Sequence, residues 1–286
     1  MRTVVITGGT DGIGKGLALR HLRQGDRVLA VGSTPAKGEA LLAEAAALSA
    51  GERITFLRAD LTSVAAAREL VATIESRCPS VDALVLCAQR YRLFGPRTLT
   101  ADGFEHSFAL AYLSRYVLGH GLRGALESAP RPVVMNVGTP GVPLGRIHWD
   151  DLQLTRRYSG TKATLQSFRA NDLLGVAFPV VHADTPIRYL AYHPGVVATG
   201  MPTHLPQPLR SLTKASFALF ATPVAKAVDP MTRLLDDPPG PGFTAYHTER
   251  QLPLKGPAFD EEAALRLHRL TQDLLARLGE TRPRST

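Results

Sequence analysis

The chain has little cysteine and no long apolar run. Only Cys78 and Cys87 occur among its 286 residues, too few for a disulfide framework or a cysteine-based metal site. No apolar run reaches the roughly 18 residues that a membrane span needs. An apolar strand begins at residue 4, which leaves no room for a signal peptide. We therefore expect a cytoplasmic protein with neither a metal site nor a membrane partner.

Acidic residues are outnumbered, which gives a formal net charge of +8. The basic residues are scattered, and aromatic residues, 6% of the chain, are not interleaved with them as in single-strand binders. Nucleic-acid binding is therefore not predicted, and the positive charge suits a phosphorylated cofactor equally well. A hydrophobic content of 44% is sufficient for a sizeable core.

Short apolar strands alternate with helical segments through the first two thirds of the chain. This alternation predicts an α/β fold, a doubly wound parallel sheet of the Rossmann type in a single domain. The expected strands are residues 4–7, 27–31, 54–57, 81–86, 133–137 and 187–192, and the expected helices are residues 14–23, 37–48, 64–77, 103–125 and 158–178.

The pattern changes after residue 195. We expect residues 1–195 to form the cofactor-binding core and residues 223–286 to form closing helices, at 223–235 and 260–278, and a tail. Residues 196–222 are rich in proline with little periodicity, so they are predicted to be a substrate lid, with an ordinary surface loop as the alternative. The apolar residues of this segment favour a hydrophobic ligand; they are Met201, Leu205, Leu209, Phe217 and Phe220.

A glycine-rich turn joins the first strand to the first helix. Residues 7–14 read Thr-Gly-Gly-Thr-Asp-Gly-Ile-Gly. In such a turn Gly8 permits the tight bend, Gly12 lets the backbone approach a pyrophosphate, and Gly14 lets the helix pack closely on the sheet. The helix N-terminus then faces the phosphates. Thr10, Asp11 and Ile13 complete this predicted dinucleotide site.

The end of the second strand bears on the choice of cofactor. It reads Val31-Gly32-Ser33-Thr34 and lacks the acidic residue that binds the ribose 2′-hydroxyl of NAD. Ser33, Thr34 and Lys37 can instead hold a 2′-phosphate through hydroxyl groups and charge. The sequence therefore favours NADP(H) over NAD(H). Asp60, after the third strand, is placed to accept a hydrogen bond from the adenine amino group.

The chain resembles the short-chain dehydrogenase/reductase family in the turn at residues 7–14, in Asp60-Leu61 and in His193-Pro194-Gly195. Residues 103–105, 128–130, 145–148, 151–152, 169–171 and 260–262 resemble its retinol-dehydrogenase-like branch. The resemblance implies hydride transfer between NAD(P) and a carbonyl or alcohol. The further cofactor contacts that it implies are Leu61, Ala88, Pro194, Gly195, Val197 and Thr199.

In that family an Asn, a Ser and a Tyr-x-x-x-Lys motif carry the proton chemistry; this chain departs from the first two, and its Tyr and Lys positions are ambiguous. Ala111 stands at the Asn position and Thr139 at the Ser position. Residues 86–89, Leu-Cys-Ala-Gln, replace the family's Asn-Asn-Ala-Gly. Alanine can neither donate nor accept a proton through its side chain, whereas threonine keeps a hydroxyl group.

Two registers for the Tyr and Lys positions remain open. The first uses Tyr158 and Lys162, which would share a helix face at i and i+4, but its spacing from Thr139 and Pro194 is unusual for the family. The second needs no gap and places Thr164 and Phe168 at the two positions. In the second register all four proton-handling positions are altered, because Phe168 cannot lower a neighbour's pKa and a threonine hydroxyl is a poor acid.

Other side chains near the expected sheet edge could donate a proton, although each could also be packed or solvated; they are Tyr91, Tyr112, His148 and His193. Two hypotheses follow. The first is an NADP-dependent oxidoreductase acting on a carbonyl, alcohol or imine of a small apolar molecule, with the usual or a non-standard proton donor. The alternative is a Rossmann scaffold with lost or repurposed redox chemistry: a cyclase, isomerase, dehydratase or binding protein. A homodimer through the helix at 103–125 is also expected.

Overall fold

The computed structural model describes residues 1–197 and 222–280; residues 198–221 and 281–286 lie outside this description. An eight-stranded sheet with the order β3-β2-β1-β4-β5-β6-β7-β8 forms the centre of the described part. Strands β1 to β7 run parallel, and β8 pairs antiparallel with β7. Their bounds are β1 Thr3–Thr7, β2 Arg27–Gly32, β3 Ile54–Arg58, β4 Ala83–Leu86, β5 Val133–Val137, β6 Arg188–His193, β7 Gly242–His247 and β8 Arg250–Gln251. The predicted doubly wound sheet is confirmed.

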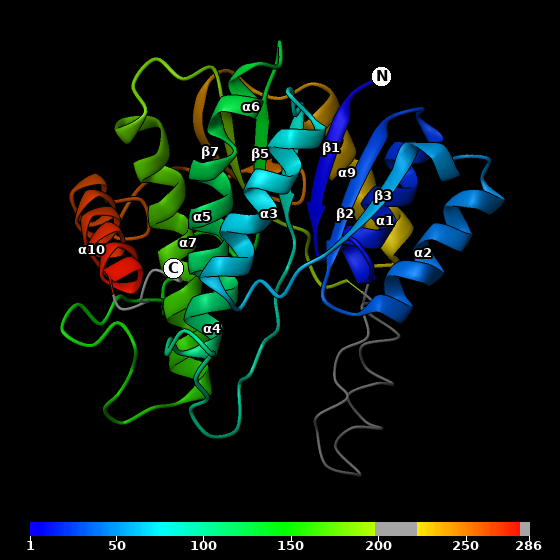
Figure 1. Ribbon diagram of the computed structural model, residues 1–286. Coiled ribbons are helices and arrows are strands. Elements are labelled where there is room, and N and C mark those ends of the chain that lie inside the picture. Colours follow the sequence, from blue (N-terminus) through cyan, green and yellow to red (C-terminus); the bar gives the residue numbers. More distant parts are fainter. Residues whose placement is uncertain (198–221, 281–286) are drawn as a thin grey trace.

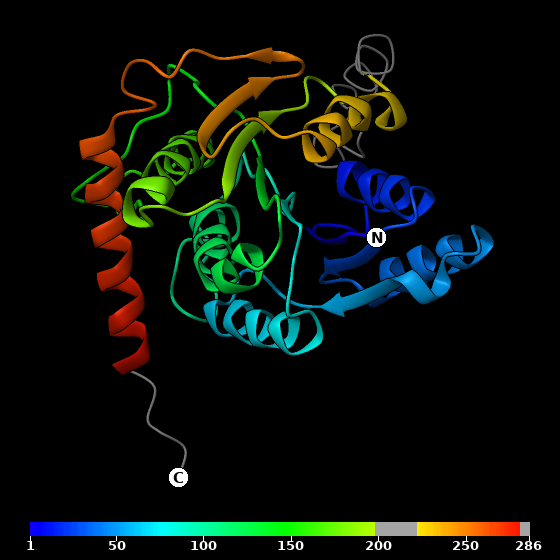
Figure 2. The same cartoon turned by 90° about the horizontal axis from the view of Figure 1, so that it is seen from above.

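Helices cover both faces of the sheet (Figures 1 and 2). One apolar cluster joins α1, α2 and α9 to the sheet, and a second joins α3, η2, α5 and α7 to the other face. Their bounds are α1 Gly12–Arg23, α2 Pro35–Ala47, η1 Gly51–Arg53, α3 Val64–Arg77, α4 His106–Phe108, η2 Ala109–Leu113, α5 Ser114–Gly121, α6 Arg123–Glu127, α7 Gly160–Val181, α9 Val224–Asp236 and α10 Glu261–Glu280. Because both faces are covered, β1, β4 and β5 are apolar along almost their whole length.

The strand order reverses between β1 and β4. The chain moves outward from β1 to β2 and β3, then returns to place β4 on the other side of β1. In doubly wound sheets ligands bind outside the carboxyl ends of the strands at such a switch point. The loops that follow β1, β4, β5 and β6 all leave the sheet at this edge, because these strands are parallel.

The segment predicted as one helix at residues 103–125 is interrupted. A short α4 leads into η2, a π-helical stretch, then α5, and α6 begins after Leu122. A π-helical stretch adds a residue to the turn and rotates the side chains that follow it. The predicted helix at 158–178 begins at Gly160, because Ser159 has an extended backbone with φ of −151°. Strands β7 and β8 form in a stretch for which the sequence pattern predicts no element.

Helix α10 packs outside the helical layer, against α7 and the η2–α5 segment (Figure 2). Tyr112 Oη and Thr271 Oγ1 lie 2.7 Å apart, and Tyr116 Oη lies 3.2 Å from His268 Nδ1. His120 of α5 completes this contact, with its Nδ1 2.7 Å from Nε2 of His182 at the end of α7. Three imidazoles from three elements thus meet under α10, and we call His120, His182 and His268 the histidine cluster.

Candidate active site

The turn between β1 and α1 has the geometry of a phosphate cradle. Gly8 and Gly12 have φ of 65° and 51°, which side chains rarely tolerate. A Cβ on Gly14 would lie 2.3 Å from the Gly8 carbonyl oxygen, so α1 can approach the turn only with glycine at this position. The residues present therefore fit a dinucleotide pyrophosphate at the N-terminus of α1. Within this turn Thr10 is buried against Gly32, and Ile13 packs on the core.

Asp11 and Lys37 form an ion pair beside this cradle. The Asp11 carboxylate accepts a hydrogen bond from the Gly12 amide at 2.7 Å and lies 2.5 Å from Lys37 Nζ. Lys37 is the main cause of a lowered pKa of Asp11. Ser33 and Thr34 are exposed at the end of β2, and Lys37 lies in the first turn of α2. The three residues predicted to hold a 2′-phosphate therefore follow β2 beside the cradle.

Three more residues predicted to contact the cofactor, Asp60, Leu61 and Ala88, follow strands β3 and β4. Asp60 is exposed after β3 and holds Thr62 through its amide and hydroxyl groups, at 3.0 and 2.8 Å, whereas Leu61 is buried in the core. Ala88 follows β4, and its amide donates to Thr7 Oγ1 at 3.2 Å.

Pro194, Gly195 and Val197 follow β6 at the same edge. Gly195 has φ of 76° and donates its amide to His193 Nδ1, and Val197 forms a bridge with Thr222. Thr199 and most of the lid predicted at residues 196–222, from residue 198 to 221, lie outside the described residues.

Tyr158 and Lys162 do not share a helix face, since Tyr158 precedes α7. The Tyr158 hydroxyl donates to Glu105 Oε1 at 3.1 Å, and Lys162 Nζ donates to the Arg157 carbonyl at 2.9 Å. Burial, followed by the Glu105 carboxylate, raises the pKa of Tyr158 to about 12. Glu105 itself caps α4 through the Phe108 amide. The phenol of Tyr158 is thus engaged in a structural contact.

The positions of the second register are packed into the protein. Thr164 is buried, and its hydroxyl is one of the buried polar groups without a partner in the described structure. Phe168, one turn further along α7, meets the ring of Tyr91 edge-on, with centroids 5.6 Å apart and planes at 76°. The Ala111 carbonyl accepts a hydrogen bond from Asn171 Nδ2 at 2.7 Å.

Tyr91 is the phenol whose surroundings include Thr139. The polar groups that act on its hydroxyl electrostatically are Thr139, Arg115 and Gln89. Burial raises the pKa of Tyr91, while Thr139, Arg115 and Gln89 act to lower it. The loops after β4 and β5, two neighbouring strands, therefore bring a phenol and a hydroxyl together at the sheet edge.

Arg115 is a functional candidate that the sequence reasoning missed. It is 1% exposed on α5, one turn after Ala111. Its guanidinium donates to Asn136 Oδ1, to the Val137 carbonyl at 2.9 Å, to the Ala88 carbonyl at 3.3 Å and to Gln89 Oε1 at 3.2 Å. The available signal was a single charged residue in the otherwise uncharged stretch at residues 108–118.

Of the other predicted proton donors, Tyr112 and His193 make side-chain contacts elsewhere, and His148 is held through its backbone amide. Tyr112 is buried under α10. His148 donates its amide to Gln166 Oε1 at 2.9 Å. His193 packs edge-on against His247 with ring centroids 4.8 Å apart, and its pKa is lowered by burial and by His247.

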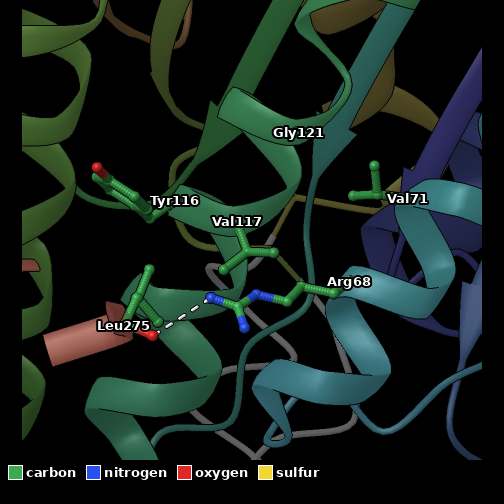
Figure 3. Close-up of a pocket in the computed structure, with 6 residues that line it drawn as sticks. All are labelled: Arg68, Val71, Tyr116, Val117, Gly121 and Leu275. Carbon is green, nitrogen blue, oxygen red and sulfur yellow. Dashed lines mark hydrogen bonds between the residues drawn. The ribbon is translucent and has the colours of Figure 1, made fainter. Parts of the chain in front are cut away.

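An apolar hollow lies between α3, α5 and α10 (Figure 3). Arg68 crosses it toward the Leu275 carbonyl, at 3.4 Å. No predicted site residue lines it, so this hollow is separate from the sheet edge. Among the described residues, no helix is long and apolar enough to span a bilayer, and no group of three or more His, Cys, Asp or Glu is arranged to hold a metal.

Comparison with known proteins gives the same assignment. The chain matches the sequence profile described as short chain dehydrogenase over residues 2–209. It is 32% identical over 269 residues to a Streptomyces sp. (strain C5) protein named as a candidate daunorubicin C-13 ketoreductase, an alignment covering 93% of this chain and 90% of that protein. It is 31% identical over 204 residues to Bos taurus retinol dehydrogenase 12, covering 71% of this chain and 64% of the relative.

A solved structure shares the fold. A Burkholderia cenocepacia short chain dehydrogenase in complex with NADP aligns with a TM-score of 0.64 at 17% identity, over 87% of this chain and 96% of that one.

Proposed function

Because this chain belongs to the short chain dehydrogenase family, we propose that it is an NADP(H)-dependent oxidoreductase acting on a carbonyl, alcohol or imine of a small apolar molecule. One observation carries the proposal: the glycine cradle of β1–α1 lies at the switch point of the sheet, where a Cβ on Gly8 would lie 3.0 Å from the Ala88 amide nitrogen. A dinucleotide bound there extends toward the residues that follow β4 and β5.

Each part of the cofactor has a matching set of residues. Backbone amides at the start of α1 bind the pyrophosphate, and Lys37 with Ser33 and Thr34 binds the 2′-phosphate. Asp60 accepts from the adenine amino group. When bound, the nicotinamide supplies or accepts a hydride, and this chain's residues orient the substrate and handle the proton. Thr139 orients the carbonyl oxygen through its hydroxyl group.

The substrate and direction rest on the relatives and on the apolar lid sequence. The Streptomyces relative is named for ketone reduction and the bovine one for retinol oxidation. Reduction of a ketone is the direction that an NADPH preference supports.

A second function rests on the altered positions. Ala111 and Phe168 lack proton-handling groups and the Thr164 hydroxyl is a poor acid, which favours a repurposed scaffold such as a cyclase, isomerase, dehydratase or binding protein. A substrate with its own acid, such as an iminium, is compatible with hydride transfer without a protein donor. We further propose that the protein is cytoplasmic and forms a homodimer. Cell fractionation tests the location, and light scattering tests the dimer.

The first experiment is an equilibrium titration of the purified protein with NADPH and, separately, with NADH. We expect micromolar binding that is tighter for NADPH. Tighter NADH binding would refute the roles of Ser33, Thr34 and Lys37. Failure of both cofactors to bind at millimolar concentration would refute the oxidoreductase and leave the second function.

A further inference from the structure

We propose that Tyr91 delivers the proton to the substrate's carbonyl oxygen and that Arg115 stabilises the phenolate that remains, an inference that rests on the proposed function. The family's usual Tyr and Lys would both come from the long helix α7. Here the phenol would come from the loop after β4 and the cation from α5.

The position of Tyr91 follows from a chain of contacts that begins at the cofactor cradle. Ala88 lies against Gly8 of the cradle and donates its amide to Thr7 Oγ1 at 3.2 Å. Tyr91 is three residues further along the same loop, which Arg115 holds through the Ala88 carbonyl and Gln89 Oε1, and Thr139 is among the groups that act on its hydroxyl. The hydroxyl that orients a carbonyl oxygen and a phenol that can protonate the same oxygen thus lie together beside the cradle.

Phe168 fixes the orientation of the phenol. Its ring meets that of Tyr91 edge-on, with centroids 5.6 Å apart, a favourable aromatic geometry. In the ungapped register Phe168 occupies the position of the family lysine. That position then contributes a packing surface for the proton donor, and the positive charge must come from another residue.

Arg115 is that charge. A buried cation is costly unless it is paired, yet within residues 1–197 and 222–280 no carboxylate forms an ion pair with it. The acids in its electrostatic surroundings are the weak acids Tyr91, Cys87 and Tyr189. Its hydrogen bonds to Asn136, Val137, Ala88 and Gln89 hold the guanidinium rigidly beside the loop of Tyr91. A positive charge held in this way stabilises a phenolate as it forms.

A polar relay ties Arg115 to α7. Asn136 accepts from Arg115 and donates to Asn171 Oδ1 at 3.0 Å, and Asn171 donates to the Ala111 carbonyl at 2.7 Å. The relay crosses β5, α7 and η2, so it fixes the α5 backbone that carries the cation. This arrangement explains why Ala111 needs no side-chain function.

The reaction step balances without another reactant. With a hydride supplied by the reduced cofactor when bound, the C=O π bond would break and the carbonyl oxygen would take the Tyr91 proton. The substrate would leave as the alcohol, and the phenolate left on Tyr91 would regain a proton from solvent. Tyr158 is a poorer donor, because Glu105 accepts its hydrogen bond and opposes the negative phenolate.

The kinetic test compares three tyrosine-to-phenylalanine variants with NADPH and 4-nitrobenzaldehyde as the carbonyl probe. We expect Tyr91→Phe to lower kcat by about 10²- to 10³-fold with little change in NADPH affinity. Tyr158→Phe is the competing donor, and Tyr246→Phe is the matched control on β7. Full activity of Tyr91→Phe, or loss only in Tyr158→Phe, would overturn the proposal.

A second readout does not depend on turnover. NMR titration of protein carrying [ζ-¹³C]tyrosine, assigned with Tyr91→Phe, follows the Tyr91 phenol directly. We expect its titration midpoint to fall when NADP⁺ binds, to rise by about one unit or more in Arg115→Met, and to return in Arg115→Lys. If Arg115→Met does not fold, Thr139→Val is used, for which a raised midpoint is also expected.

The two readouts separate the possible failures. If NADP⁺ and NADPH do not bind, the proposed function fails and this inference fails with it. If they bind while the Tyr91 midpoint is unaffected by NADP⁺ and by the Arg115 or Thr139 change, the inference alone is refuted.

Discussion

Replacing His120 with glutamine is expected to make the folded protein less sensitive to acid. His120 lies in the histidine cluster, where its ring centroid is 4.2 Å from that of Tyr116 and 5.2 Å from that of Phe178. Burial, followed by His182, His268 and Arg123, lowers its pKa to about 3. The folded state therefore holds this imidazole neutral where an unfolded chain would protonate it.

The sign and size follow from proton linkage. The folded state binds fewer protons than the unfolded chain, so the stability contributed by neutral His120 is present above pH 6.5 and is lost as pH falls toward 3. With an unfolded pKa of about 6.5, acidification from pH 7 to pH 5 costs about 2 kcal/mol of unfolding free energy at this residue alone. His182 and His268 have lowered pKa values as well, so they add to the loss in the wild type.

The assay is urea denaturation at pH 7 and pH 5, with wild type, His120→Gln and His247→Gln compared. We expect the loss of unfolding free energy between the two pH values to be about 2 kcal/mol smaller in His120→Gln than in the wild type. The control removes an exposed imidazole on β7 that also contributes to the lowered pKa of His193, so we expect it to reduce the loss far less than His120→Gln does. An equal loss in wild type and His120→Gln would refute the reasoning that burial keeps this ring neutral.

Three further predictions concern the site and its support. Gly14→Ala places a Cβ 2.3 Å from the Gly8 carbonyl oxygen, so we expect a destabilisation of roughly 1–3 kcal/mol and loss of NADPH binding. Gly124→Ala, in open space on α6, is expected to keep both the stability and the NADPH binding of the wild type. Calorimetry and cofactor titration check this, and tight NADPH binding by Gly14→Ala would contradict it. Lys37→Met is expected to weaken NADPH about tenfold and NADH far less, as two parallel titrations measure, and equal weakening would argue against a 2′-phosphate contact. Burial raises the pKa of Asp172 to about 8, so folding takes up a proton and the unfolding free energy falls as pH rises from 4 to 8, by at most about 1.4 kcal/mol per pH unit. Denaturation of Asp172→Asn across this range is expected to show a weaker dependence of unfolding free energy on pH than the wild type. An unchanged dependence would show that Asp172 is ionised in the folded protein.

The alternation of strands and helices was predictable because its causes are local. Buried parallel strands must be apolar, and Gly8, Gly12 and Gly14 mark a turn that few other sequences can form. The interruption of the 103–125 helix was not, because η2 is held by contacts from distant residues, including Asn171 to the Ala111 carbonyl. The start of α7 likewise depends on Gly160, where a Cβ would collide with the Arg92 carbonyl.

The sequence specifies the candidate cofactor residues more directly than the proposed proton-handling ones. Residues 7–14 form one contiguous motif, so their spacing is informative by itself. Tyr91, Arg115 and Thr139 come from three separate elements, and only the sheet order and the turn of α5 bring them together. The pair Tyr158 and Lys162 matched a motif in sequence, yet Tyr158 lies ahead of the helix that would have aligned them.

The packing of α10 has a consequence for how the protein is made. Thr271 and His268 contact Tyr112 and Tyr116, which flank Arg115 along the η2–α5 segment. The clamping residues on α10 are translated after every strand of the sheet. A ribosome-bound chain that has emerged only as far as β8 therefore holds the cradle, the phenol and the guanidinium without the brace that sets α5 in place. Catalytic competence is expected to appear late in synthesis, after the cofactor cradle has formed.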